Sequence, residues 1–569
     1  MAELPDQSRV VLRWSGSLGF VLGALFADWQ VVVETGQVLA GLVSYPPDNP
    51  FFLYHATVWS LLNQGAAVML RAGASEIASS VIVSGLLGLV SFQALSIVAY
   101  TFNRDARLAI GVPFVVFLSR ATNFGVVYPV WLLATEHTYG VIGLGWVVLV
   151  AGLFAAGRAK LAGFLLGVAP AIHPSLGLFL GLLIAITAVW DRQMARAAIR
   201  SGRWPFLAGC AVTLASLAIH AAMMPASPEL DSASAARFLT AFVALWDPHR
   251  GAVNFRSTGI AVVAGIMLVA LVALTRSARL TPGQRFLLRF VLVTAVASLG
   301  LAWLTHLPAA STPPALLVLM PARVLNVDIF IAAALLLGLC HRRSRLAQTM
   351  MVALTALLVF RSRSMVWLVF DPDVTRGLAA VSVAAALAVA LVARHRGIDV
   401  ARAITMTLMA AAFGLASYLA ADRLLTHGHA LLRDRTNEPV FERASRGSGV
   451  LVTGGDLHLI QLRTRRPVLL DGGGMDALPY VLAAAPATAA ILRDVYGIDF
   501  FNPPREGRGQ GRIPSEPNRL VWEGYSAARW SEIALTHGVT EVLSPAGWTL
   551  QLPVVATGHG VTLHAIPRR

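Results

Sequence analysis

Apolar residues along this chain gather in long runs, and short polar breaks rich in arginine separate them. A run of about 20 apolar residues is the length a helix needs to cross the hydrocarbon core of a bilayer. The single crossings expected on this basis are residues 10–27, 77–102, 108–120, 140–157, 205–224, 259–275, 286–306, 323–340, 347–361, 378–394 and 403–421. Together with a hairpin across 161–190, they predict about 13 membrane-spanning helices.

The hairpin follows from the length of the apolar run 161–190 and from the residues at its centre. At a rise of ~1.5 Å per residue, a single helix over this run would exceed the thickness of the bilayer core. Pro170 and Pro174 lie near the centre with His173 between them, and both flanks are basic. Because proline interrupts helices and basic flanks stay on one side of the membrane, two crossings are expected here.

The arginine-rich breaks all fall on one side of this arrangement. They are residues 104–107, 158–160, 192–203, 276–285, 342–345 and 394–402. Loops rich in lysine and arginine stay in the cytoplasm, so we expect a multi-pass protein of the bacterial inner membrane with a cytoplasmic N-terminus. The external side then receives residues 28–76, 120–139, 225–258, 307–322 and everything after 422.

The character of the sequence changes after residue 421. Apolar runs shorten to strand length, at 450–453, 457–462, 467–470, 539–543 and 561–566. Helix-like stretches lie at 477–496 and 527–537, and 505–517 is rich in Gly, Pro and Arg and is expected to be a loop. Alternating short strands and helices are typical of a small α/β domain.

The expected fold class is therefore mainly α: a polytopic helical membrane protein with a C-terminal periplasmic α/β domain. The transmembrane domain would cover residues 1–421, with interfacial helices in its first external loop, 28–76. The soluble domain would cover residues 422–569. Phe51, Phe52, Tyr54 and Trp59 in the first loop suit the membrane interface, where aromatic rings are enriched.

The composition agrees with a membrane protein. Of the 569 residues, 56% are hydrophobic and 13% are charged, a balance that soluble domains do not show. The net charge of +15 follows from the positive-inside bias and from attraction to anionic lipid headgroups. No zinc-finger, helix-turn-helix or RNA-binding signature accompanies this charge, so nucleic acid is not an expected partner.

The usual motifs of soluble enzymes are missing. The glycines at 454–455 and 472–474 form neither a dinucleotide-binding fingerprint nor a P-loop, so they are interpreted as turns. What remains is a set of polar residues that all map to the external side: Asp28, Glu34, Asp48, Glu136, His137, His173, Asp247, His249, Arg250 and Arg323. Carboxylates can deprotonate an acceptor hydroxyl, and the planar fork of arginine can bind two oxygens of a phosphate.

Some of these residues also have a structural explanation. His173 could cap a broken helix by hydrogen-bonding backbone groups, and Asp247 and His249 could be turn residues. Arg323 could extend toward external phosphates, although its position opposes the positive-inside trend. Several carboxylates, histidines and arginines at one membrane face nevertheless form a coherent site for transfer from a lipid-phosphate sugar.

This layout resembles the GT-C superfamily of integral-membrane glycosyltransferases, which includes oligosaccharyltransferases and lipid-dependent mannosyl- and arabinosyltransferases. The resemblance lies in the acidic residue after the first helix, in the stretch FADWQ, and in the long first external loop. It extends to the many crossings and the C-terminal periplasmic α/β domain. It implies an inverting enzyme that transfers a sugar from a polyprenyl-phosphate donor to an acceptor on the periplasmic side.

The resemblance also implies roles for individual residues. Asp28 would be the catalytic base, and Glu136 would be the second acidic position. Arg323 would be similar to the arginine that contacts the donor phosphate. For such an enzyme we expect Glu136 and His137 to orient the acceptor, and Arg250 to hold the phosphate together with Arg323. The other candidate substrate-binding residues are Glu34, Asp48, His173, Asp247 and His249.

The expected partners are a polyprenyl-phosphate-linked sugar, a glycan or lipid acceptor, and membrane lipids. The cofactor stays open: a divalent cation, Mg²⁺ or Mn²⁺, is the candidate, and no metal ligands are assigned. The family's first-loop motif is commonly a pair of adjacent acids, whereas Asp28 is followed by Trp29 and Gln30. Two other classes therefore remain: a transporter or flippase of a lipid-linked or anionic substrate, and a non-catalytic GT-C-like protein of cell-envelope assembly.

Overall fold

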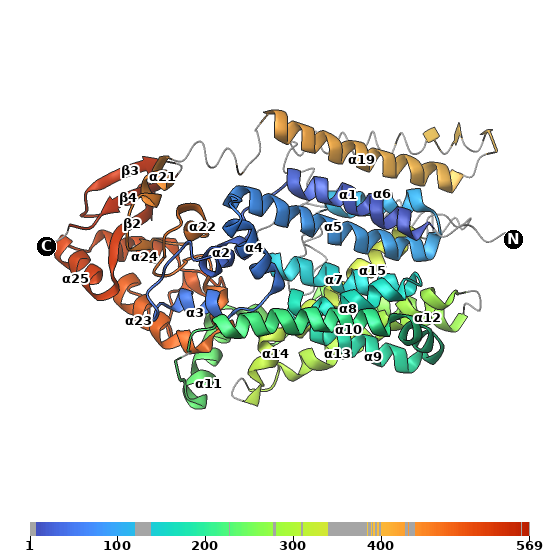
Figure 1. Cartoon of the computed structure of the whole chain (residues 1–569), viewed down its shortest axis with the longest axis horizontal. Coiled ribbons are helices and arrows are strands. Elements are labelled where there is room, and N and C mark those ends of the chain that lie inside the picture. The colour runs from blue at the N-terminus through green and yellow to red at the C-terminus, as the bar shows by residue number, and fades with distance from the viewer. Residues whose placement is uncertain are drawn as a thin grey trace.

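The protein is a polytopic helical membrane protein with a small C-terminal domain (Figure 1). The computed structural model describes residues 7–119, 138–226, 228–276, 280–308, 311–338, 400–426, 439–558 and 560–567, with a few isolated positions between 384 and 397 and Leu431. The helical bundle occupies one end of the molecule and the C-terminal domain the other. Helix α1 (Ser8–Leu25) begins at the end of the bundle far from this domain.

Six helices within the described residues are long and apolar enough to cross a membrane. They are α5 (Glu76–Asn103), α7 (Thr138–Ala155), α10 (Arg192–Met223), α12 (Thr258–Arg276), α13 (Pro282–Leu304) and α15 (Pro321–Gly338). Shorter apolar stretches lie in α6 (Ala106–Ser119), α8 (Ala159–Ile172), α9 (Pro174–Trp190) and α19 (Val400–Thr426). The spans predicted at 347–361 and 378–394 lie outside the described residues or largely so.

Helix α1 (Ser8–Leu25) packs against α5 at very short range because its contact face is made of glycine. A Cβ atom at Gly19 would meet the backbone oxygen of Gly88 at 2.3 Å, and one at Gly23 would meet that of Ser84 at 2.2 Å. Small residues at helical spacing allow two backbones to approach in this way within a membrane. A side chain at either position would force the two helices apart.

The predicted hairpin is present, but the helix that follows it is longer than the sequence pattern indicated. His173 separates α8 from α9, in agreement with the prediction of a break there. The helix that contains the crossing predicted at 205–224 begins at Arg192, so its first residues are those interpreted as a polar break. The part of it that is long and apolar enough to cross a membrane is Ala198–Met223. Arginine and alanine in that segment are strong helix formers, so the helix extends beyond its apolar part.

Three short helices occupy the first long loop: α2 (Val31–Leu39), α3 (Pro50–Thr57) and α4 (Leu61–Arg71). The sequence sets the start of α3, because the Asn49 side chain accepts hydrogen bonds from the N–H groups of Phe51 and Phe52 and Pro50 occupies the first helical position. The Asn49 amide also donates to the carbonyl of Val468 at 3.3 Å. The loop is thereby attached to the C-terminal domain.

The C-terminal domain is built on a four-stranded sheet in the order β1-β2-β4-β3. The strands are β1 (Val450–Thr453), β2 (Val539–Pro545), β3 (Val554–Gly558) and β4 (Val561–Ala565). Strand β1 is parallel to β2, while β4 is antiparallel to both β2 and β3. The helices are α21 (Pro439–Ser445), α22 (Ile460–Thr464), α23 (Ala485–Tyr496), α24 (Ser515–Glu523) and α25 (Ala527–His537).

Several element predictions for this domain were wrong. The apolar run 457–462 forms a turn and α22 rather than a strand, because its backbone folds back toward the first loop. Run 467–470 contributes only an isolated bridge between Leu451 and Val468. Strand β3 was missed, and the loop predicted at 505–517 ends early because α24 begins at Ser515.

The core of the C-terminal domain is shared with loops of the bundle. Trp246, from the segment after α11 (Ser232–Ala241), is fully buried and donates from its ring nitrogen to the carbonyl of Phe500 at 2.9 Å. Leu53 from α3 lies in the same apolar cluster. Tyr45 donates its hydroxyl hydrogen to Gln461. The domain is therefore held to the bundle by buried contacts as well as by the chain itself.

Candidate functional site

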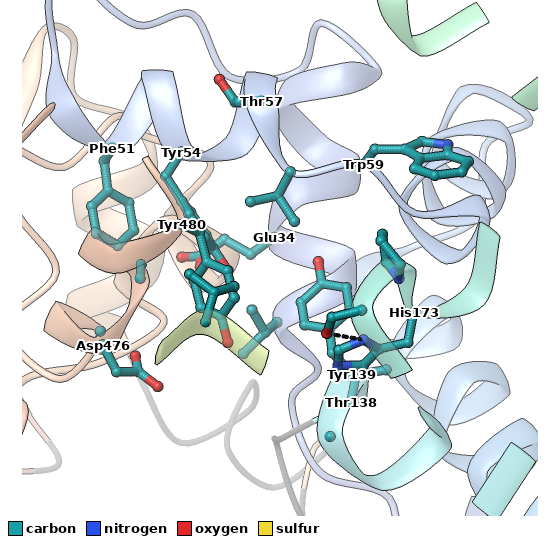
Figure 2. Close-up of a pocket in the computed structure, with 18 of the residues that line it drawn as sticks. Glu34, Phe51, Tyr54, Thr57, Trp59, Thr138, Tyr139, His173, Asp476 and Tyr480 are labelled. Carbon is teal, nitrogen blue, oxygen red and sulfur yellow. Dashed lines mark hydrogen bonds between the residues drawn. The ribbon is translucent and has the colours of Figure 1, made fainter. Parts of the chain in front are cut away.

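A cavity of about 290 Å³ lies where the helical bundle meets the C-terminal domain (Figure 2). Parts of the chain far apart in sequence form its walls: α2, α3 and the residues after α3, the start of α7, the break between α8 and α9, α14 (Pro314–Leu319), the start of α15, and a turn at 473–480. Its polar lining residues are Glu34, Tyr54, Thr57, Trp59, Thr138, Tyr139, His173, Ser175, Arg323, His458, Asp476 and Tyr480.

Glu34 supplies the carboxylate on the first wall. It lies in the first turn of α2 and is 2% exposed. Its backbone carbonyl accepts a hydrogen bond from the side chain of Gln461 at 2.9 Å, so contact with the C-terminal domain fixes its position. Tyr54 lies beside it, where burial and then neighbouring charges, Glu34 among them, raise the pKa of that phenol (Figure 2). The phenol therefore stays protonated as a hydrogen-bond donor.

Arg323 supplies the cation from a different wall, at the start of α15. It is 4% exposed, and its backbone N–H donates to the carbonyl of Met320, which has φ 50° where α14 turns into α15. Its positive charge lowers the pKa of two other lining groups, His173 and Tyr480. Burial alone would raise the pKa of the Tyr480 phenol, but Arg250 and Arg323 outweigh it and lower that pKa. The two guanidinium groups therefore dominate the charge around the Tyr480 hydroxyl.

His173 both lines the cavity and caps the broken helix, as one of the two sequence interpretations proposed. Its Nδ1 accepts from the N–H of Leu176 at 3.4 Å and contacts the hydroxyl of Ser175 at 3.3 Å (Figure 2). Burial, with Arg323 adding to it, lowers the pKa of His173 to about 3. The imidazole is therefore neutral at physiological pH and adds no positive charge to the cavity.

Asp247, His249 and Arg250 lie behind the wall formed by Tyr480. Asp247 is buried and pairs with both His249 and Arg250; the Arg250 Nε–Asp247 Oδ2 distance is 2.7 Å. The guanidinium also donates to the carbonyl of Asp476 at 3.3 Å and to the Tyr480 hydroxyl at 3.4 Å. Burial opposes ionisation of Asp247, but its two partners lower its pKa. These three residues brace the turn that lines the cavity.

The remaining candidates from the sequence take other positions. Asp28 does not line the cavity among the described residues; its carboxylate accepts from the N–H of Trp29 at 2.9 Å in the turn between α1 and α2. Asp48 is exposed in the turn before α3. Glu136 and His137 lie outside the described residues.

Sequence reasoning missed a group of aromatic and polar lining residues. Tyr54 and Trp59 were noted only as interface-seeking residues, although their place in the first loop put them near Glu34. Asp476 and Tyr480 lie in the tail without any motif, so no sequence signal distinguished them. His458 contacts Asp471 through Nδ1 at 2.8 Å, next to the glycines at 472–474 that were interpreted as turns.

The described residues do not form a ready ligand set for a divalent cation. No group of three or more His, Cys, Asp or Glu side chains is close enough there to hold a metal ion. Glu34 and Asp476 are the acidic side chains that line the cavity in this part of the chain. Mg²⁺ prefers several oxygen ligands in octahedral geometry, and Glu136 and His137 lie outside the described residues, so the divalent cation stays a prediction.

Acid should destabilise the protein through its buried neutral histidines. Burial lowers the pKa of His55 to about 3, and its Nδ1 lies 3.0 Å from the hydroxyl of Thr35. The unfolded chain binds a proton near the ordinary pKa of about 6.5, so stability falls by about 1.4 kcal/mol per pH unit for each such histidine between 6.5 and 3. The melting temperature should fall less between pH 7 and pH 5 in His55→Gln than in the wild-type protein.

His395 is an exposed histidine that serves as a control for this effect. The variant His395→Gln should keep the acid sensitivity of the wild-type protein. An equal loss of melting temperature in wild type and His55→Gln would contradict the assignment of a neutral buried His55.

No protein-family model matches the sequence, and a search of curated proteins finds no match. Among solved structures, the chain is similar to the crystal structure of ArnT from Cupriavidus metallidurans in the apo state. The two are 13% identical, the comparison covers 98% of each chain, and the TM-score is 0.40. A likeness at this level concerns only the general layout, so function has to be inferred from the residues of the cavity.

Proposed function

We propose that this protein is a GT-C-like membrane glycosyltransferase that moves a sugar from a polyprenyl-phosphate donor to an acceptor hydroxyl. The reaction would take place on the side of the C-terminal domain, which we assign to the periplasm. One observation carries this proposal: a buried carboxylate, Glu34, and a buried guanidinium, Arg323, line the same cavity from different walls. Such a transfer needs a base for the acceptor and a cation for the leaving phosphate.

In the proposed reaction the acceptor oxygen attacks the anomeric carbon of the donor sugar, and its proton passes to Glu34. The bond between that carbon and the phosphate oxygen breaks, and its electron pair leaves with the polyprenyl phosphate. Arg323 stabilises the added negative charge with two N–H donors, which suit phosphate oxygens. Attack opposite the leaving group inverts the anomeric centre.

Glu34 takes the place that the sequence gave to Asp28. Both residues belong to the first loop, but only Glu34 of the two lines the cavity among the described residues. The Asp28 carboxylate instead bonds to the backbone of Trp29. The assignment of Glu136 as a second acidic residue stays a prediction. Thr138 and Tyr139, which follow it closely in the sequence, line the cavity.

Arg323→Gln should raise the KM for the donor by about 10- to 100-fold, because a hydrogen bond to a charged group contributes roughly 1.5–3 kcal/mol. The measurement uses full-length protein in proteoliposomes with a panel of polyprenyl-phosphate-linked sugars, and it follows the release of free polyprenyl phosphate. Arg323→Lys should recover part of the loss, since lysine keeps the charge but not the fork.

Arg256 provides a matched control, because it is an exposed arginine in the loop before α12. Arg256→Gln should keep the wild-type KM. An unchanged donor KM in Arg323→Gln would remove Arg323 from the donor site. Movement of intact donor across the bilayer without release of polyprenyl phosphate would favour a transporter, and binding without either event would favour an assembly protein.

A further inference from the structure

A second cavity, of about 270 Å³, lies between α8, α9, α10 and α13 and is distinct from the one described above. Its walls are almost wholly apolar: Phe154, Gly163, Leu166, Ile184, Ala188, Ala195, Ala198, Ile199, Gly202, Phe206 and Phe286. A Cβ at Gly163 would meet the backbone oxygen of Gly202 at 2.6 Å, so α8 and α10 pack closely at these two lining positions. An apolar crevice of this kind fits a hydrocarbon chain.

Four arginines form a stripe along α10 beside this cavity. Arg192, Arg196, Arg200 and Arg203 follow one another at intervals of four, four and three residues, which places them on one side of the helix. All four are exposed, and Arg203 is itself part of the cavity lining. The cavity-facing residues of α10, including Ala195, occupy the adjoining face, so the stripe borders the opening.

The charge at this opening is positive despite the presence of one carboxylate. Asp191 belongs to the lining, but Arg289 on α13 pairs with it at 2.7 Å. That pair neutralises the carboxylate and leaves the arginines of α10 to set the local potential. An anion is therefore the ligand that the rim favours.

Two exposed tryptophans indicate the depth of the cavity in the membrane. Trp190 is 50% exposed and Trp204 68% exposed, at the end of α9 and inside α10. Each ring carries a guanidinium over its face, Arg289 at 5.5 Å from Trp190 and Arg203 at 5.4 Å from Trp204. Tryptophan with basic neighbours marks the boundary between headgroups and acyl chains. Because Trp190 and Trp204 are the chain neighbours of the lining residues Asp191 and Arg203, we place the cavity at that boundary.

We propose that this cavity binds an anionic phospholipid of the leaflet on the arginine-rich side of the membrane. One acyl chain occupies the apolar cavity, and the headgroup phosphate lies against Arg203 and its neighbours on the stripe. Guanidinium groups bind phosphate oxygens in pairs, and basic residues near the surface favour anionic over zwitterionic lipid. The site is independent of the transferase proposal, because its residues are far from Glu34 and Arg323 in the fold.

The test measures lipids retained by purified full-length protein after extraction from vesicles that contain equal amounts of phosphatidylglycerol and phosphatidylcholine. Native mass spectrometry should show one retained phosphatidylglycerol on the wild-type protein. Because each basic residue contributes about a fivefold preference, Arg196→Gln, Arg200→Gln and Arg203→Gln together should reduce this preference roughly 100-fold. All three residues are exposed, so the variant should keep its fold.

Two controls distinguish a specific lipid-binding site from nonspecific attraction of anionic lipid to surface arginines. Arg9→Gln, Arg104→Gln and Arg276→Gln together remove the same charge from exposed positions that do not line this cavity, and retention should not change. Ala195→Phe, or Ala188→Phe on α9, fills the cavity and keeps every arginine, and retention should be lost. Three results would overturn the proposal. The wild-type protein could retain both lipids equally, or the control triple variant could lose as much phosphatidylglycerol as the α10 variant. The third is full retention by both Ala195→Phe and Ala188→Phe.

Discussion

Replacing Glu34 by glutamine should lower the turnover number by about 10²- to 10⁴-fold, the range that a positioned general base contributes. Glutamine has the size of glutamate but cannot accept the acceptor proton. The backbone of Glu34, which receives the hydrogen bond from Gln461, is unchanged by this substitution, so α2 should keep its contact with the C-terminal domain. The loss should therefore appear in kcat, with little change in donor KM.

The matched variant is Asp28→Asn, which removes the other carboxylate of the same loop. We expect it to keep most of its activity, because Asp28 bonds to the N–H of Trp29 and does not line the cavity among the described residues. The two variants and wild type are compared for release of polyprenyl phosphate at saturating donor and at equal membrane levels. If Asp28→Asn is inactive and Glu34→Gln is active, Asp28 is the catalytic base, as the sequence suggested.

The length of the apolar runs was enough to predict a bundle of membrane-spanning helices, because the bilayer imposes length and composition on any helix that crosses it. The break at His173 was also predictable, since two prolines flank it. The start of α10 was not, because arginines after a turn are compatible with either a loop or a protruding helix. A membrane constrains the apolar part of a helix and leaves its polar extension to local propensity.

The candidate site was predictable to a lesser degree. Glu34, His173 and Arg323 were singled out by their external position, and the fold brings them to one cavity. Tyr480 reaches that cavity only because the C-terminal domain packs on the first loop. Contacts across more than 400 positions of sequence, such as that of Gln461 with Glu34, leave no local pattern. For the same reason the sequence alone does not indicate that Glu34, rather than Asp28, lines the cavity among the described residues.

The second large effect expected is on stability, at the buried pair of Asp247 and Arg250. Arg250→Met should destabilise the protein by about 3–5 kcal/mol, because it leaves the buried Asp247 carboxylate without the guanidinium that pairs with it. The side chains of Arg250 and Asp247 are 2% and 0% exposed, so water cannot replace the lost contact. Thermal melts in detergent, followed by the fluorescence of the 13 tryptophans, would measure the loss of stability.

Comparison with two further variants separates the buried charge from the loss of packing. Arg256→Met removes an exposed arginine of the same loop and should leave the melting temperature close to that of wild type. Asp247→Leu combined with Arg250→Met removes both charges, and it should melt above Arg250→Met alone, since apolar residues can replace a buried ion pair. A double variant no more stable than Arg250→Met would mean that the bonds from Arg250 to Asp476 and Tyr480 dominate. In that case the loop is fixed through the cavity wall, and loss of Arg250 should weaken donor binding together with stability.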